Sequence, residues 1–501
     1  MKQTLTFILA LLLAGAAVAQ VDPNDYEKKK QEMMERYKQS KDSAKQQYDE
    51  ARKKAEEEYA AFRKRANEEY AAAMQRAWQR MGVQPAEPKP EEPKPPKPPT
   101  PPAPDAKPTT EPLPAEEVIP APPANVPPAI PAPPVKAPEP AVPTMQFAVY
   151  GTNCSIHTDT EPLKFKLASV DEKGAADAWK QLSQNKYDGM LHDCLAQRDL
   201  LHLGDWGYLC LLRSATEKLL GKGSNESVLL QMYLLTQSGY SVRLAKVDNK
   251  FVLLIPFNSK IIGYSYTIID NKKFYLLTKS KINSIEVCNI GFPREQIANV
   301  MLTELPILKG NPQPKHTFSG RRFGTMTANV SVDKSLIDYM NDFPLLSGAW
   351  ESYANAGLSD KVKADLYPAL KSQIEGKSKQ KAVFMLLDFV QYAFTYATDE
   401  DQFGYERPLF GDESFFYPKN DCEDRAILFS ILVRDLVGLD VVLVHWPGHL
   451  GAAVAFPNEI EGDYYVVDGR RFTVCDPTYI GAKIGMTMPD LKDAPAKIVR
   501  L

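Results

Sequence analysis

A cysteine, a histidine and an aspartate follow one another at equal distances in the last third of the chain. Cys422 lies in DCEDRA, His449 in PGHLGAAVAF and Asp476 in CDPTY, each 27 positions after the one before. A cysteine nucleophile needs a base to take its proton and a third group to orient that base. We therefore select Cys422, His449 and Asp476, in that order, as the candidate catalytic residues.

The stretch from Asp421 to Gly438 predicts the helix that must position the cysteine. Acidic residues stand at its front, and apolar residues recur behind them at steps of three and four, which is the pattern of a helix buried on one face. Cys422 therefore falls in the first turn, where unpaired backbone N–H groups stabilise a thiolate. The apolar residues are Ile427, Leu428, Ile431, Leu432, Leu436 and Val437.

Together, DCEDRA, a histidine followed by an apolar strand, and DPTY resemble the transglutaminase-like superfamily over roughly Leu386 to Tyr479. The resemblance implies a papain-like core in which Cys422 is the nucleophile, His449 the base and Asp476 the orienting carboxylate. LDFVQYAFTY is similar to a phrase that precedes the cysteine in related bacterial sequences. By that analogy, Gln391 donates to the oxyanion beside the Cys422 backbone N–H.

The chain departs from this family pattern in two places. Leu450 and Gly451 follow the histidine, where many relatives have an aromatic residue. The interval before Asp476 is also long enough for an additional hairpin, DYYVVDGRRFTV, with Asp468-Gly469 as its turn. Both departures leave the three candidate residues in place and bear on substrate preference.

The start of the chain predicts export. Residues 1–19 contain one lysine, an apolar stretch and Ala17-Val18-Ala19, which is typical of a cleaved signal peptide. No later stretch is apolar enough to span a membrane, and a net charge of -3 argues against nucleic-acid binding. We expect a periplasmic or extracellular protein. The five cysteines other than Cys422 cannot all pair within one chain, so we expect buried free thiols rather than a disulfide framework.

Residues 24–82 predict a long helix with an eleven-residue repeat. Tyr26, Tyr37, Tyr48, Tyr59 and Tyr70 are spaced eleven apart, and Met or Ala follows each of them by seven residues. This period favours a straight or slightly right-handed supercoil. A self-associating stalk and a solvated single helix both remain open.

Residues 83–144 contain 25 of the 41 prolines and predict an extended linker in polyproline II conformation, without a core of its own.

The remaining chain predicts two copies of one α+β fold, residues 145–309 and 318–501. With Gly239 on Gly438, SVLLQMYLLTQSGYSVRLA aligns without a gap with AILFSILVRDLVGLDVVLV, and KFVLLIPF then falls on HLGAAVAF. After a one-residue shift, IIDNKKFYLL falls on VVDGRRFTVC. The first copy has Gly223, Lys250 and Thr278 opposite the three candidate residues, so we expect it to be a non-catalytic module.

We therefore expect an exported cysteine peptidase or amidase that forms a thioester with a peptide or protein substrate, such as one of the cell envelope. A crosslinking transglutaminase and a non-catalytic scaffold or adaptor remain as alternatives. No cofactor or metal is expected. His445 lies four residues before His449, but Pro447 between them forbids the helix that would make the two a zinc pair.

Overall fold

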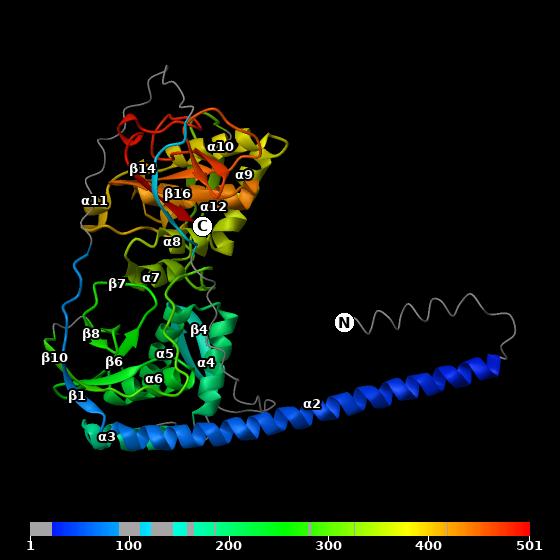
Figure 1. The fold of residues 1–501 in the computed structure, drawn as a ribbon, viewed down its shortest axis with the longest axis vertical. Coiled ribbons are helices and arrows are strands. Elements are labelled where there is room, and N and C mark those ends of the chain that lie inside the picture. The colour runs from blue at the N-terminus through cyan, green and yellow to red at the C-terminus, as the bar shows by residue number, and fades with distance from the viewer. Residues whose placement is uncertain are drawn as a thin grey trace. The chain divides into compact units, whose positions relative to one another are not determined.

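The computed structural model describes residues 23–89, 111–121, 144–157, 165–184, 187–278, 282–324, 326–417 and 419–501 (Figure 1). The chain divides into two compact units, Met1–Arg65 and Ala66–Leu501. The expected signal peptide lies outside the described residues. Among the described helices, none combines the length and the apolar character needed to cross a bilayer.

The predicted long helix is α2 (Pro23–Met74), which is 52 residues long. Its end needs a correction, because residues 78–82 form strand β1 instead of continuing the helix to residue 82. Trp78 pairs with Cys288 in the neighbouring strand, and its ring packs 6.3 Å from that of Phe251. The helical preference of these residues is therefore outweighed by their pairing with the edge of the sheet.

Two six-stranded sheets follow the same strand order. In each sheet, a central strand directly follows a buried helix. One outer strand of each sheet comes from the part of the chain that precedes both halves. The first sheet runs β1 (Trp78–Gly82), β10 (Ser284–Cys288), β5 (Arg243–Val247), β6 (Lys250–Pro256), β9 (Lys272–Leu276), β8 (Tyr266–Ile269). The second runs β2 (Ala115–Ile119), β20 (Ala496–Arg500), β16 (Val441–Trp446), β17 (His449–Val454), β19 (Arg470–Val474), β18 (Tyr464–Val467).

A β-hairpin and several helices precede each sheet, so each half is α+β as predicted. The first half has β3 (Thr144–Val149), β4 (Thr152–His157), α3 (Glu172–Leu182), α4 (Asp188–Leu200), α5 (Asp205–Leu220) and α6 (Asn225–Gln237). The second has β11 (His316–Ser319), β12 (Thr327–Val330), α7 (Lys334–Asp342), α8 (Trp350–Ala356), α9 (Asp360–Ile374), α10 (Lys379–Ala393), α11 (Asp399–Phe403) and α12 (Cys422–Val437). In the first half α6 packs on α5, and in the second half α12 packs on α10; each of these last helices also packs on the central strands of its sheet.

Short elements complete the described chain. β7 (Ile261–Ile262) pairs with β13 (Leu345–Leu346), and β14 (Thr395–Tyr396) pairs with β15 (Lys419–Asn420). Two 3₁₀ helices are η2 (Glu413–Phe415) and η3 (Pro489–Leu491). One large buried apolar cluster includes residues of both halves. Each sheet also has a smaller apolar cluster of its own, on the face turned away from the large cluster.

The strand ends agree with the sequence alignment of the two halves. β6 begins at Lys250 and β17 at His449, the two residues that were aligned. After the one-residue shift, the β8–β9 hairpin aligns with the β18–β19 hairpin, and the strands of the two hairpins begin and end at aligned residues. The second hairpin turns at Asp468-Gly469, as predicted, with both residues at positive φ. Because the first half has the same hairpin, this feature belongs to the common topology rather than to an insertion.

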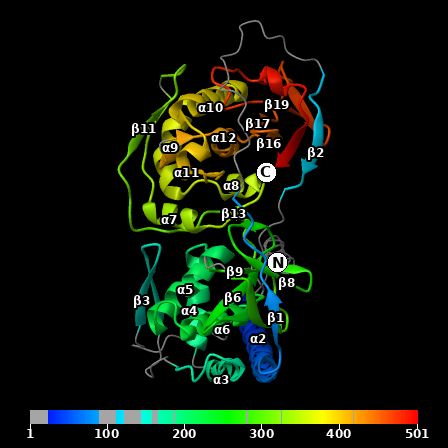
Figure 2. The ribbon, with the colours of Figure 1, turned by 90° about the vertical axis from the view of Figure 1, so that its left-hand side faces the viewer.

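The Pro-rich segment contributes to a core, which corrects the expectation that it would not. Strand β2 runs parallel to β20, from which it is separated by almost the whole globular chain (Figure 2). The Leu113 side chain is 8% exposed in the second sheet's apolar cluster, and its backbone N–H donates to the Tyr464 carbonyl at 2.8 Å. Residues 90–110 and 122–143 lie outside the described chain.

Candidate active site

Helix α12 begins at Cys422, as the apolar periodicity predicted, and its first turn is fixed by acidic side chains. The Asp421 backbone N–H donates to Asp424 Oδ2 at 3.3 Å, and Asp424 Oδ1 accepts the Leu409 N–H at 2.8 Å. The helix ends at Val437, and Gly438 after it takes a left-handed conformation that closes the last turn. Cys422 is thus held in the first turn, next to backbone N–H groups with no partner inside the helix.

Cys422 differs from the other cysteines in exposure and surroundings. It is 9% exposed, whereas each of the other five is 3% or less exposed, and all six are free thiols. Burial raises the pKa of Cys154 to about 11 and that of Cys288 to about 12, which keeps those thiols protonated. The Cys422 sulfur lies 3.1 Å from Oε2 of Glu423.

His449 and Asp476 meet because two neighbouring strands of one sheet carry them. His449 is the first residue of β17, and Asp476 follows the end of β19, which pairs with β17. His449 Nε2 lies 2.9 Å from Asp476 Oδ2. Asp476 Oδ1 accepts the backbone N–H groups of Thr478 and Tyr479, so the carboxylate is fixed on both oxygens. Nδ1 is the ring nitrogen that remains for a second partner.

The Cys422 sulfur is close enough to His449 to affect its titration. Burial of the ring disfavours the imidazolium form, but the Asp476 carboxylate and the nearby Cys422 sulfur outweigh it and raise the pKa of His449 to about 10. The imidazolium is therefore the favoured form at neutral pH. The structure thus brings Cys422, His449 and Asp476 together in one buried group.

Trp446 supports the histidine from one face. The two residues pair across the turn between β16 and β17, and their rings lie 5.6 Å apart with an angle of 20° between their planes. A Cβ added at Gly451 would lie 2.9 Å from Cζ3 of Trp446 and 3.6 Å from Cγ of Asp476. Gly451, noted in the sequence as a departure from the family pattern, therefore leaves room for the indole and the carboxylate together.

Gln391 lies near Asp476, but its amide is already engaged. Its Nε2 is within hydrogen-bonding distance of the Asp476, Tyr479 and Ala482 carbonyl oxygens at 3.0–3.3 Å, and its Oε1 accepts the Gly481 N–H. These bonds hold the loop that carries Asp476. Its role as an oxyanion donor stays a prediction.

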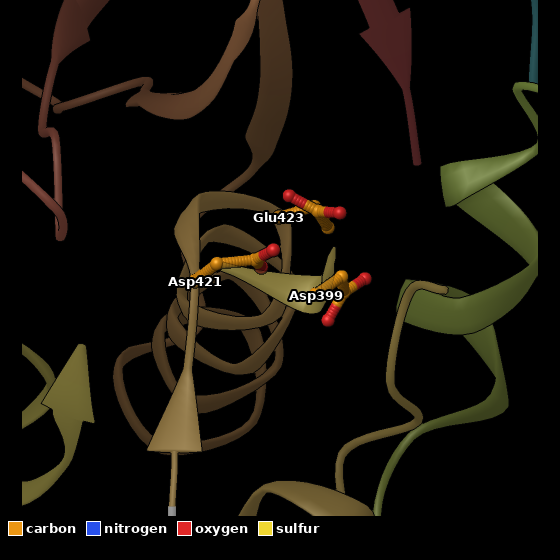
Figure 3. A group of neighbouring side chains, drawn as sticks. All are labelled: Asp399, Asp421 and Glu423. Atoms are coloured by element: carbon orange, nitrogen blue, oxygen red, sulfur yellow. The ribbon is translucent and has the colours of Figure 1, made fainter. Parts of the chain in front are cut away.

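Three buried carboxyl groups lie close together at the start of helix α12, as Figure 3 shows. An oxygen of each of Asp399, Asp421 and Glu423 lies within 4.8 Å of the others. Burial raises the pKa of Asp399 to about 9 and moves the pKa values of Asp421 and Glu423 well above their usual range. Such a group either shares protons or offers the oxygen ligands that suit a hard divalent cation.

Sequence reasoning missed this group. Asp421 and Glu423 were noted only as the acidic front of a helix, and Asp399 is 22 residues away. The available signal was that both immediate neighbours of the candidate nucleophile are acidic.

Arg425 is a buried cation three residues after the cysteine. It is 1% exposed, its Nη2 donates to the Phe394 carbonyl at 2.9 Å, and its guanidinium lies over the Tyr396 ring. Burial lowers the pKa of Arg425, although the carboxylates of Asp421 and Asp424 partly oppose this. A buried cation in the first helical turn offsets part of the negative charge around Cys422.

The first half lacks this chemistry at the equivalent positions. Gly223 and Lys250 are exposed at the surface, and Thr278 follows β9 with a partly exposed side chain. None of the three can supply a thiolate, an imidazole or a carboxylate.

A cavity of about 820 Å³ lies at the opposite end of α12, beside Ile431, Arg434 and Asp435. It is not lined by any of the candidate catalytic residues.

Comparisons of the chain with protein-family models, with curated proteins and with solved structures found no match.

Proposed function

We propose that the chain is an exported cysteine hydrolase of the transglutaminase-like type, acting on a peptide bond or carboxamide. The observation that carries the proposal is the 2.9 Å contact between His449 Nε2 and Asp476 Oδ2, with the Cys422 thiol beside the same imidazole at the start of a buried helix. Nucleophile, base and orienting carboxylate are all present within one half of the chain.

In the proposed reaction, the Cys422 thiolate attacks the carbonyl carbon and a tetrahedral oxyanion forms. The Cys422 backbone N–H, at the helix N-terminus, stabilises that oxyanion. The His449 imidazolium then gives its proton to the leaving amine, and a thioester with Cys422 remains. His449 next takes a proton from water, which attacks the thioester and releases the carboxylic acid. Water is the default acceptor. A lysine amine in its place would make the enzyme a crosslinking transglutaminase.

We further propose that both halves are transglutaminase-like domains and that the first is a non-catalytic copy. The shared strand order of the two sheets and the matching strand ends support a duplication. The exposed Gly223 and Lys250 support the loss of catalysis in the first half.

Thiol labelling followed by mass spectrometry tests the catalytic proposal. We expect iodoacetamide to modify Cys422 at neutral pH before the other five cysteines, and His449→Ala or Asp476→Asn to slow that modification at least tenfold. The matched variants Lys250→Ala and Thr278→Ala alter the equivalent positions of the first half and should leave the rate unchanged. Equal, slow labelling of all six cysteines would favour a non-catalytic scaffold.

The acceptor is identified by a second measurement. The chain is incubated with peptides that carry glutamine or other carboxamides, with and without a biotinylated primary amine. Release of acid or of a shorter peptide supports hydrolysis, whereas incorporation of the amine assigns the crosslinking reaction. Both reactions should be lost in Cys422→Ala.

A further inference from the structure

One face of α2 exposes large apolar side chains in a regular pattern. The tyrosine stripe consists of Met33, Tyr37, Ala44, Tyr48 and Ala55, which follow one another at steps of four and seven. Tyr37 is 66% and Tyr48 67% exposed, and Met33 is 43% exposed. An exposed apolar patch of this kind is a feature of interaction sites, whereas single exposed apolar residues are common.

The same repeat is buried at the end of the helix. Ala66 and Tyr70 occupy the next alanine and tyrosine positions and are 5% and 3% exposed. The Tyr70 ring lies 4.5 Å from that of Trp179 and 5.4 Å from that of Phe292. These positions therefore act as packing positions where the helix meets a folded surface.

The spacing suits a long contact between helices. An eleven-residue period is close to three helical turns, so the stripe stays on one face with little drift, and two straight helices can remain in contact over several repeats. Four tyrosines from two copies would bury about 600–1,000 Å², since each aromatic side chain buries about 150–250 Å². With the alanines, methionines and the stems of flanking lysines and arginines, the area approaches the roughly 1,200 Å² of a specific interface.

We propose that a second copy of this chain covers the tyrosine stripe, with the two α2 helices antiparallel and Tyr37 of one copy beside Tyr48 of the other. This interface does not depend on the hydrolase proposed above.

Charge complementarity decides the direction. Residues 37–47 contain three lysines and one aspartate, a net charge of +2, whereas residues 48–58 contain three basic and five acidic residues, a net charge of -2. Parallel helices in register would place like charges side by side. With Tyr37 beside Tyr48, the two-fold axis of the antiparallel arrangement passes between residues 42 and 43. Residues 48–58 then face residues 27–37 of the other copy, which contain four basic and three acidic residues, a net charge of +1, while residues 38–47 face one another.

Sedimentation velocity of the full chain over a range of concentrations tests the interface. We expect a monomer–dimer equilibrium, and we expect Tyr37→Ala with Tyr48→Ala to raise the dissociation constant at least about tenfold. Gln39→Ala with Gln46→Ala, two uncharged exposed residues on the opposite face, is the matched control and should change the constant less than about twofold. A monomer at all concentrations, or equal effects of the two double variants, overturns the proposal.

Cysteine crosslinking tests the direction. The variants Tyr37→Cys and Tyr48→Cys are made in a Cys422→Ala background, because Cys422 is the native thiol expected to react; the other five cysteines are buried, so each variant introduces one accessible thiol. Mixing the two variants under mild oxidation should give a disulfide-linked heterodimer, while either variant alone should stay uncrosslinked. Crosslinking of each variant with itself would overturn the antiparallel arrangement. If the chain stays a monomer and binds anionic lipid vesicles through the same tyrosines, the stripe binds a membrane surface. That result would overturn the proposal that a second copy covers it.

Discussion

The imidazole of His449 is constrained by three neighbours, and Gly451 is the residue that lets them fit. The indole of Trp446 covers one face of the ring, the Asp476 carboxylate contacts Nε2, and the Cys422 thiol lies close by. A methyl group at position 451 would press on the indole ring and approach the carboxylate. The histidine's orientation therefore depends on a residue that takes no part in the chemistry.

We predict that Gly451→Ala lowers the rate of Cys422 alkylation about tenfold and destabilises the chain by about 1–3 kcal/mol, because the inserted methyl group overpacks the site. Alkylation kinetics and urea unfolding would measure the two effects. Gly189→Ala, in helix α4, is the control, since nothing lies within 4 Å of its added Cβ, and both quantities should stay near wild type. Wild-type alkylation in Gly451→Ala would show that the tryptophan does not position the histidine.

At the residue scale, the sequence identified the candidate site residues better than it predicted the contacts that their side chains make. The spacing of Cys422, His449 and Asp476 indicated a group that the structure brings together. The amide of Gln391 could not be assigned from sequence, because its partners are backbone carbonyls about 90 residues away. Asp399 was missed as a neighbour of Cys422 for the same reason, since only the folded loop brings it there.

At the scale of elements, the least expected finding is a strand within a proline-rich segment. Pro114 and Pro120 flank β2, so neither interrupts the pairing of Ala115 to Ile119 with β20. An edge strand tolerates proline at its ends because only one side of the strand donates to the ladder. Composition therefore predicted an extended chain, but it could not predict which part of that chain finds a sheet edge.

We predict that Leu113→Ala destabilises the chain by about 2–3 kcal/mol, because it removes a buried side chain from the second sheet's apolar cluster. Glu116→Ala, an exposed position in β2, should change the free energy of unfolding by less than about 0.5 kcal/mol. Urea denaturation of the two variants would measure the difference. Equal values would mean that the segment does not pack on the sheet in solution.

At the scale of the globular unit, the two halves share contacts. Strand β7 of the first pairs with β13 of the second, and the Trp206 ring lies 6.4 Å from that of Phe343. The Leu302 backbone N–H donates to Ser352 Oγ at 2.9 Å. The alignment of the two halves predicted a duplication from sequence, but these contacts could not be predicted because they involve residues outside the aligned segments.

We therefore predict that residues 66–501 unfold in one cooperative transition. Tyr233→Ala in the first half and Phe429→Ala in the second should both shift that transition, each by about 3–5 kcal/mol, because both side chains belong to the same apolar cluster. Calorimetry combined with tryptophan fluorescence would detect it. Two transitions, each shifted only by the variant in its own half, would contradict a shared core.

The pairing of β2 with β20 also sets an order of events during biosynthesis. The two strands are about 380 residues apart, so β2 leaves the ribosome long before its partner has been translated. The second sheet can be completed only after residues 496–500 have been made, and a nascent or prematurely terminated chain would present an unpaired sheet edge. The prolines that flank β2 are useful before β20 has been made, because they keep the unpaired strand from pairing with other chains.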